Sequence, residues 1–268
     1  MTRTLVIILS ETRAHELTYE SFAKNVLDEL KADLCVSIGV RPGYDFENPF
    51  YKNAKYKFTY DEPDDYKDAL IEAFHTLGVP NEWEKFYHIG NECLGGMKPY
   101  IGSGGISTFY RWFTLHNLQK NGLIDAYDRF VITRSDYMYV KPHPQMHELD
   151  PAYLWIPDCC HYLNGYNDRH IVASRENVHI CLNIINTMAF NPDTFFQVMR
   201  YNTRNVELLL RKNIEFQNGQ VRMMKPFMYT IRARNGPTSW SVGVYDEKKG
   251  YYIKYEEEYE AAIKDSTM

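Results

Sequence analysis

The sequence predicts an α/β fold in which a mainly parallel central sheet is flanked by helices. Residues 5–9 (LVIIL) form a continuous apolar run of strand length, which is typical of a strand buried on both faces of a sheet. Residues 19–30 place apolar side chains at spacings of three and four, as an amphipathic helix does, and residues 34–38 form a second apolar run. A strand, a helix and a strand in this order make a βαβ unit, whose two strands must be parallel.

The same patterns predict the remaining elements. Apolar runs indicate further strands at residues 56–60, 129–133 and 154–156. Helical spacing and capping residues indicate helices at 64–75, from Ser107 to near Gly122, and over most of the chain from residue 177, including 194–199. The charged residues 256–258 indicate either a terminal helix or a frayed end. Since no repeat or linker interrupts the chain, we expect one domain over residues 1–268, with an α/β part at about 1–176 and a mainly helical part at about 177–268.

Composition excludes several classes of protein. Aromatic residues make up 15% of the 268 residues, which requires a packed interior and excludes a disordered chain. No apolar run approaches the roughly 20 residues of a membrane span. The first apolar run has no small-residue cleavage site and is followed at once by Glu11 and Arg13, so we interpret it as a strand rather than a signal peptide.

Cysteine usage and charge narrow the setting. Five cysteines without a C-x-x-C spacing argue against a zinc site and a disulfide framework, so we expect a cytoplasmic protein, either free or peripheral to a membrane. The net charge of −5 argues against general nucleic-acid binding. Residues 200–234, however, carry eight Lys or Arg against two Glu. This stretch is either a solvated basic face or a face turned toward an anionic ligand.

Two polar segments directly follow predicted strands, where open α/β sheets bind their ligands. After the first strand, Arg13 can pair with a phosphate near a helix N-terminus, or form a surface ion pair with Glu11. After the strand at 129–133, Asp136 can hold a divalent cation, or cap a turn and pair with Arg134.

A third segment, residues 165–169 (GYNDR), follows the strand at 154–156. It combines an amide, a carboxylate and a guanidinium, which are groups that recognise sugar hydroxyls, although Asn-Asp is also ordinary turn chemistry.

Other sequence motifs for catalysis or nucleotide binding are weak or missing. The glycines of residues 102–105 lack a complete G-x-G-x-x-G, and neither H-E-x-x-H nor G-x-S-x-G occurs.

Taken in order, these pieces resemble a GT-A-type glycosyltransferase of the kind found in capsule, lipopolysaccharide and large-virus glycan pathways. The resemblance spans about residues 4–235 and rests on the order of its motifs: the strand and polar turn at 5–13, the helix and strand at 19–38, the helix at 107–121, the strand and motif at 131–136, the segment 165–169 and the helix at 205–209. It implies a Rossmann-like sheet, a nucleotide-diphosphate-sugar donor, a glycan acceptor and a place in polysaccharide biosynthesis. The α/β part would bind the nucleotide sugar, and the C-terminal part would face the acceptor.

The resemblance also implies residue roles. The nucleotide would lie against Ser10, Thr12, Arg13 and Arg134. The usual D-x-D metal motif is here Arg134-Ser135-Asp136, so Asp136 would bind Mn²⁺ or Mg²⁺, with Arg134 supplying part of the positive charge. Because a metal ligand contributes charge more than packing, we expect the fold to tolerate loss of the Asp136 carboxylate.

The acceptor side follows in the same way, with Tyr166, Asn167 and Arg169 as acceptor-binding residues. An inverting transfer also needs a carboxylate base. We prefer Asp168, which lies in a solvent-facing turn. The second candidate is Glu207. Burial on an apolar helix would raise the pKa of Glu207, unless its carboxylate pairs with Arg204 or Arg211 on the helix surface.

Two other functions remain open. The same fold can serve as a catalytically inactive module that binds a nucleotide or a glycan. A sugar nucleotidyltransferase is less favoured, because the N-terminal region lacks its Gly-rich strand-to-helix loop with a basic signature.

Overall fold

The computed structural model describes residues 2–79, 88–89, 92–93, 95–98, 103–191, 206–234 and 242–264. Its strands are β1 (Thr4–Ser10), β2 (Asp33–Val40), β3 (Tyr56–Asp61), β4 (His88–Ile89), β5 (Glu92–Cys93), β6 (Arg129–Thr133), β7 (Tyr137–Tyr139), β8 (Leu154–Pro157), β9 (Ile171–Ser174), β10 (Val221–Met224), β11 (Met228–Arg232), β12 (Val244–Asp246) and β13 (Tyr251–Ile253). Its helices are α1 (His15–Phe22), η1 (Ala23–Asp28), α2 (Pro49–Asn53), α3 (Lys67–Thr76), α5 (Gly104–Lys120), α6 (Leu123–Ala126), η3 (Tyr162–Asn164), α7 (Val178–Leu182), α8 (Ile184–Phe190), α10 (Val206–Phe216) and α11 (Glu256–Ile263).

The central sheet has seven strands in the order β10-β8-β9-β6-β1-β2-β3. The pairs β1–β2, β2–β3, β1–β6 and β8–β10 are parallel, whereas β9 runs antiparallel to both β6 and β8. The predicted α/β class with a mainly parallel sheet is therefore confirmed. Strand β9 is not among the strands expected from the sequence. Its reversed direction has no sequence signal either, because four small or apolar residues look alike in parallel and antiparallel strands.

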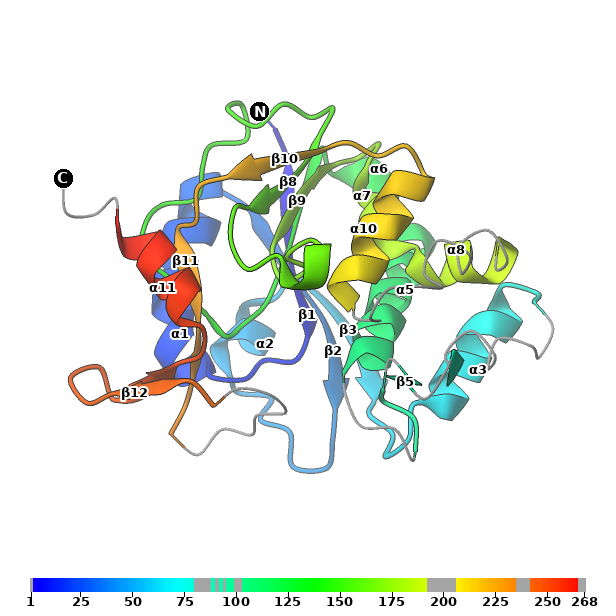
Figure 1. Cartoon of the computed structure of the whole chain (residues 1–268), viewed down its shortest axis with the longest axis horizontal. Coiled ribbons are helices and arrows are strands. Elements are labelled where there is room, and N and C mark those ends of the chain that lie inside the picture. Colours follow the sequence, from blue (N-terminus) through cyan, green and yellow to red (C-terminus); the bar gives the residue numbers. More distant parts are fainter. Residues whose placement is uncertain are drawn as a thin grey trace.

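The sheet is covered on both faces, as Figure 1 shows. On β1, Leu5 and Ile7 point into a core built with α3, α5, α7, α8 and α10. Their neighbours Val6 and Ile8 point the opposite way, into a core with α1, η1 and α2. Successive side chains of β1 point to opposite faces of the sheet, and both faces are buried, so residues 5–9 form an uninterrupted apolar run.

A second, antiparallel sheet has the order β12-β13-β11-β7, and α11 packs on it through Ala262. The C-terminal portion is thus helical only in part: α7, α8, α10 and α11 lie there as expected, but four strands lie there too. β10 adds to the central sheet, and β11 to β13 build the second sheet with β7.

Element boundaries differ slightly from the expected ones. Helix α5 begins at Gly104 rather than after Ser107, because the amide of Ser107 already donates to the Ser103 carbonyl at 2.8 Å. Helix α3 begins at Lys67 rather than residue 64. The helix expected at 194–199 and the first glycine of the 102–105 segment lie outside the described residues.

Membrane-spanning helices and disulfide bonds are two features that the sequence argues against. Within the described ranges, no helix has the length and apolar character to cross a membrane. Of the cysteines, Cys35, Cys159, Cys160 and Cys181 are free thiols.

Candidate functional site

The predicted site residues gather at the carboxyl edge of the central sheet. Ser10, Thr12 and Arg13 form the turn after β1, and Arg134 and Asp136 lie between β6 and β7. Two further segments reach the same edge. Because β9 is antiparallel to β6, residues 165–169 before β9 arrive there, and the first turn of α10 brings Glu207 beside them.

The turns after β1 and β6 are tied together by Ser135. Its hydroxyl lies 3.0 Å from the carbonyl oxygens of both Glu11 and Arg13, and its own carbonyl accepts a 2.6 Å hydrogen bond from Thr18 in α1. Ser10 takes a positive φ of 77°, which turns the chain out of β1. Thr12 shares a 2.7 Å hydrogen bond with Tyr44. Arg13 and Arg134 are thereby held on neighbouring turns.

Asp136 is the centre of a cationic cluster. Its side chain is 1% exposed, and Arg134 donates to both of its oxygens, from Nε at 2.9 Å and from Nη2 at 2.8 Å. Arg232 of β11 donates to Oδ2 as well, and Arg13 Nε lies 3.8 Å from the same oxygen. Burial alone would raise the pKa of Asp136, but the positive charges of Arg134, Arg13 and Arg232 outweigh it and hold the pKa well below its usual value.

This arrangement does not fit a resident divalent cation. Mg²⁺ and Mn²⁺ need carboxylate oxygens that are free to coordinate, whereas those of Asp136 are occupied by guanidinium groups. In the part of the chain that the structure describes, no group of three or more His, Cys, Asp or Glu side chains could hold a metal ion. The ion pair of Asp136 with Arg134, which was the alternative to a metal role, is present. The alternative for Arg13, an ion pair with Glu11, is present too, with a distance of 2.9 Å.

Two cationic residues of the cluster were not singled out from the sequence. Arg232 appeared only as one of the basic residues of 200–234, and Lys254 follows β13 with no local signal of function. Lys254 is 6% exposed. Burial and the positive charges of Arg232 and Arg134 lower the pKa of Lys254 to about 7, with a smaller opposing effect of Asp136.

Two carboxylates, those of Glu207 and Asp168, lie within electrostatic reach of each other, and Arg134 acts on Glu207. The Asp168 carboxylate is 3.4 Å from the guanidinium of Arg111, a fully buried residue of α5 that also donates to the carbonyls of Asp168 at 2.6 Å and Cys181 at 3.0 Å. Burial and the negative charge of Asp168 raise the pKa of Glu207 from 4.5 to about 7, although Arg169 and Arg134 lower it. Glu207 does not pair with Arg211, which instead contacts Glu215 at 2.7 Å; Arg204 lies outside the described residues.

The expected acceptor residues divide into two kinds. Asn167 is buried and donates to the Cys159 carbonyl at 3.2 Å. Arg169 is buried too, with an ion pair to Glu258 at 2.8 Å and the ring of Tyr255 at 4.6 Å. These two side chains therefore contribute to holding the loop in place; their expected role as direct acceptor ligands stays a prediction, which this burial does not favour. Tyr166 remains partly exposed beside Arg211 and stays a predicted acceptor contact.

Gly165 sets the position of Glu207. A Cβ on Gly165 would lie 2.5 Å from the Cβ of Glu207 and from the amide nitrogen of Leu208, so only glycine allows the loop to approach α10 this closely. The next amide, that of Tyr166, donates to the Glu207 carbonyl at 3.0 Å.

Replacing Gly165 with alanine is expected to destabilise the protein by about 1–3 kcal/mol, as overpacking does, and to weaken any activity that depends on Glu207. Chemical denaturation would measure the stability change, with circular dichroism as a check that the fold is retained. An alanine variant as stable as the parent would contradict this tight contact.

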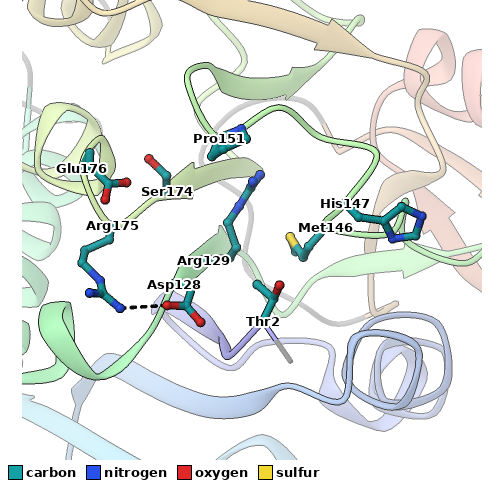
Figure 2. A pocket seen from close by; sticks show the side chains of 9 residues that line it. All are labelled: Thr2, Asp128, Arg129, Met146, His147, Pro151, Ser174, Arg175 and Glu176. Carbon is teal, nitrogen blue, oxygen red and sulfur yellow. Dashed lines mark hydrogen bonds and ion pairs between the residues drawn. The ribbon is translucent and has the colours of Figure 1, made fainter.

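A cavity of about 400 Å³ lies at the opposite edge of the sheet, around the start of β6 (Figure 2). Its lining includes Arg129, whose Nη1 donates to the Leu149 carbonyl at 2.7 Å, and the ion pair of Asp128 with Arg175 at 2.8 Å. None of the predicted site residues lines this cavity. We place the candidate site at the carboxyl edge instead, because the cationic cluster and the carboxylates of Glu207 and Asp168 lie there.

No protein-family model matches the chain, and no curated protein sequence is similar to it. Among solved structures, the apo form of mouse xyloside xylosyltransferase 1 is similar over 84% of this chain and 86% of that chain, with 9% sequence identity and a TM-score of 0.42.

Proposed function

We propose that the protein is a glycosyltransferase that moves a sugar from a nucleotide-diphosphate sugar to a hydroxyl of a glycan acceptor. One observation carries the proposal: a cationic cluster and a carboxylate with a pKa near 7 lie at the same edge of an α/β sheet, with Arg134 acting electrostatically on both Asp136 and Glu207. Cations suit a departing diphosphate, and such a carboxylate suits an acceptor hydroxyl.

The proposed reaction is a displacement at the anomeric carbon. The bond from this carbon to the diphosphate oxygen breaks, and its electron pair leaves with the diphosphate. The acceptor oxygen forms the new bond, and its proton passes to Glu207. Arg13 and Arg134 are 27% and 26% exposed, so both can reach a bound diphosphate and stabilise the negative charge that develops as it departs.

We assign the base to Glu207 rather than to Asp168. The Asp168 carboxylate already has a partner inside the protein, the fully buried guanidinium of Arg111, 3.4 Å away. Glu207, in contrast, can be ionised and still accept a proton near neutral pH because its pKa is about 7. Asp168 then acts as a positioning residue whose negative charge keeps the pKa of Glu207 high.

Incubation with a panel of UDP-, GDP- and TDP-sugars is expected to release the matching nucleoside diphosphate slowly, because water replaces the missing acceptor. A coupled assay for the free diphosphate would measure the release, and adding glycan acceptors should accelerate it. If a nucleotide sugar binds but is never consumed with any acceptor, the inactive binding module is the better description.

A further inference from the structure

The cluster around Asp136 carries more positive than negative charge. Arg13, Arg134, Arg232 and Lys254 face two carboxylates, those of Asp136 and Glu11. When Lys254 is protonated, two of these positive charges have no directly paired carboxylate among the described residues; Glu207, on which Arg134 acts at longer range, is only partly ionised near pH 7. The neighbouring pair of Arg169 and Glu258 is neutral by itself and does not change this balance.

The uncompensated charge includes a buried lysine. Lys254 lies against the ring of Tyr255, with its Nζ 5.0 Å from the ring centroid. Among the residues that the structure describes, no carboxylate forms an ion pair with this ammonium group. Lys254 lies next to Arg232, because its backbone amide donates to the Thr230 carbonyl at 3.0 Å and β13 pairs with β11 through Ile253 and Ile231. An anion bound beside these residues would stabilise the protonated lysine, which burial disfavours.

The cluster has an exposed side that an anion can reach. Asp136 holds the guanidinium groups of Arg134 and Arg232 on one centre, as a scaffold at the junction of β6 and β7. Arg13 and Arg134 are each about a quarter exposed, whereas Arg232 and Lys254 are buried. The cluster is thus open to solvent on one side and backed by cations on the other.

We propose that this cluster binds the diphosphate of the donor without a divalent cation, with Arg232 and Lys254 as binding residues alongside Arg13 and Arg134. The inference rests on the proposed function and names how its donor is held. A diphosphate linked to a nucleoside and a sugar carries two negative charges, which match the two uncompensated positive charges. Three guanidinium groups and the protonated Lys254 then supply the positive charge that a metal ion supplies where two free carboxylates are present.

The first experiment measures binding of UDP, GDP, TDP and inorganic pyrophosphate to the full chain by isothermal titration calorimetry. Each titration is run in EDTA and again in Mg²⁺ or Mn²⁺. We expect the preferred nucleoside diphosphate to bind in EDTA with an affinity within about threefold of that in metal. Binding that requires the metal overturns this inference and leaves the glycosyltransferase proposal standing.

The second experiment tests the two new residues. We expect Lys254→Met to weaken nucleoside diphosphate binding in EDTA by about 10- to 100-fold, the usual loss for a charge-assisted contact. Lys120→Met removes one charge from the exposed end of α5 and should leave binding unchanged. Arg232→Lys keeps a cation next to Asp136, so it should fold and still bind more weakly, because lysine lacks the fork that contacts a carboxylate and a phosphate together.

The outcomes separate the two proposals. Unchanged binding in both Lys254→Met and Arg232→Lys overturns the assignment of these residues. If no nucleoside diphosphate or pyrophosphate binds with or without metal, both proposals fail. Metal-free diphosphate binding without sugar transfer to any acceptor supports the anion site and contradicts the proposed function alone.

Discussion

Replacing Glu207 with glutamine is expected to reduce sugar transfer by about 10²–10⁴-fold while leaving nucleoside diphosphate affinity close to that of the parent. The amide keeps the size of the side chain but cannot accept the proton of the acceptor hydroxyl. Turnover with the preferred donor and acceptor would measure the loss, and calorimetric titration would measure the affinity. The matched control is Glu215→Gln on the same helix, because Glu215 is exposed and its carboxylate only pairs with Arg211 and Lys212.

The pKa of Glu207 gives this prediction a pH dependence. Transfer should rise as the pH increases through about 7, since the base must be ionised, and the rise should vanish in Glu207→Gln.

The stability of the folded protein should change in the opposite sense, because ionised Glu207 destabilises it. A carboxyl group whose pKa is raised on folding costs nothing below its unfolded value of 4.5 and destabilises the folded protein increasingly up to about pH 7. Glu207→Gln should therefore be more stable than the parent at pH 8, by about 1–3 kcal/mol, and equal to it near pH 4.

Two results would contradict the assignment of the base. Wild-type transfer rates in Glu207→Gln would show that another group takes the proton. A loss of transfer in Asp168→Asn with an unchanged pH profile would favour Asp168 as the base, because a positioning role requires the profile of Glu207 to shift to lower pH when the neighbouring charge is removed.

Asp136→Asn is expected to destabilise the protein by about 3–5 kcal/mol, the cost of leaving buried charges without their partner. The asparagine side chain is similar in size, but it removes the negative charge that Arg134, Arg232 and Arg13 share. Equilibrium denaturation in urea would measure the change. The matched control is Asp128→Asn, which breaks a partly exposed ion pair with Arg175 and should cost less than about 1 kcal/mol.

This prediction reverses the expectation that the fold tolerates the loss of this carboxylate. It also has a defined pH range. The pKa of Asp136 is lowered on folding, so its stabilising contribution is present above its ordinary value of 3.8 and is lost as the pH falls below it. The difference between parent and Asp136→Asn should therefore shrink in acid. A variant as stable as the Asp128→Asn control at pH 7 would show that the arginines do not depend on Asp136.

The sequence by itself determined the parallel half of the fold and the edge at which the site lies. The apolar runs that become β1 and β2 are joined by a helical segment, and this βαβ connection makes the two strands parallel, with helices covering the sheet. Once β6 is parallel to them as well, Arg13 and Asp136 must lie at the same edge, because both directly follow a strand. Gly165 and Glu207 could be named from the sequence, but not their contact.

Only the tertiary structure decided the charges around these residues. Arg232 is 96 residues from Asp136 along the chain, and Lys254 is farther still. Nothing local in a strand-end arginine or a lysine after a strand indicates that they will meet. The occupied carboxylate of Asp136 and the raised pKa of Glu207 follow from such long-range neighbours, because electrostatic energies depend on distance in space and on burial rather than on spacing in the sequence.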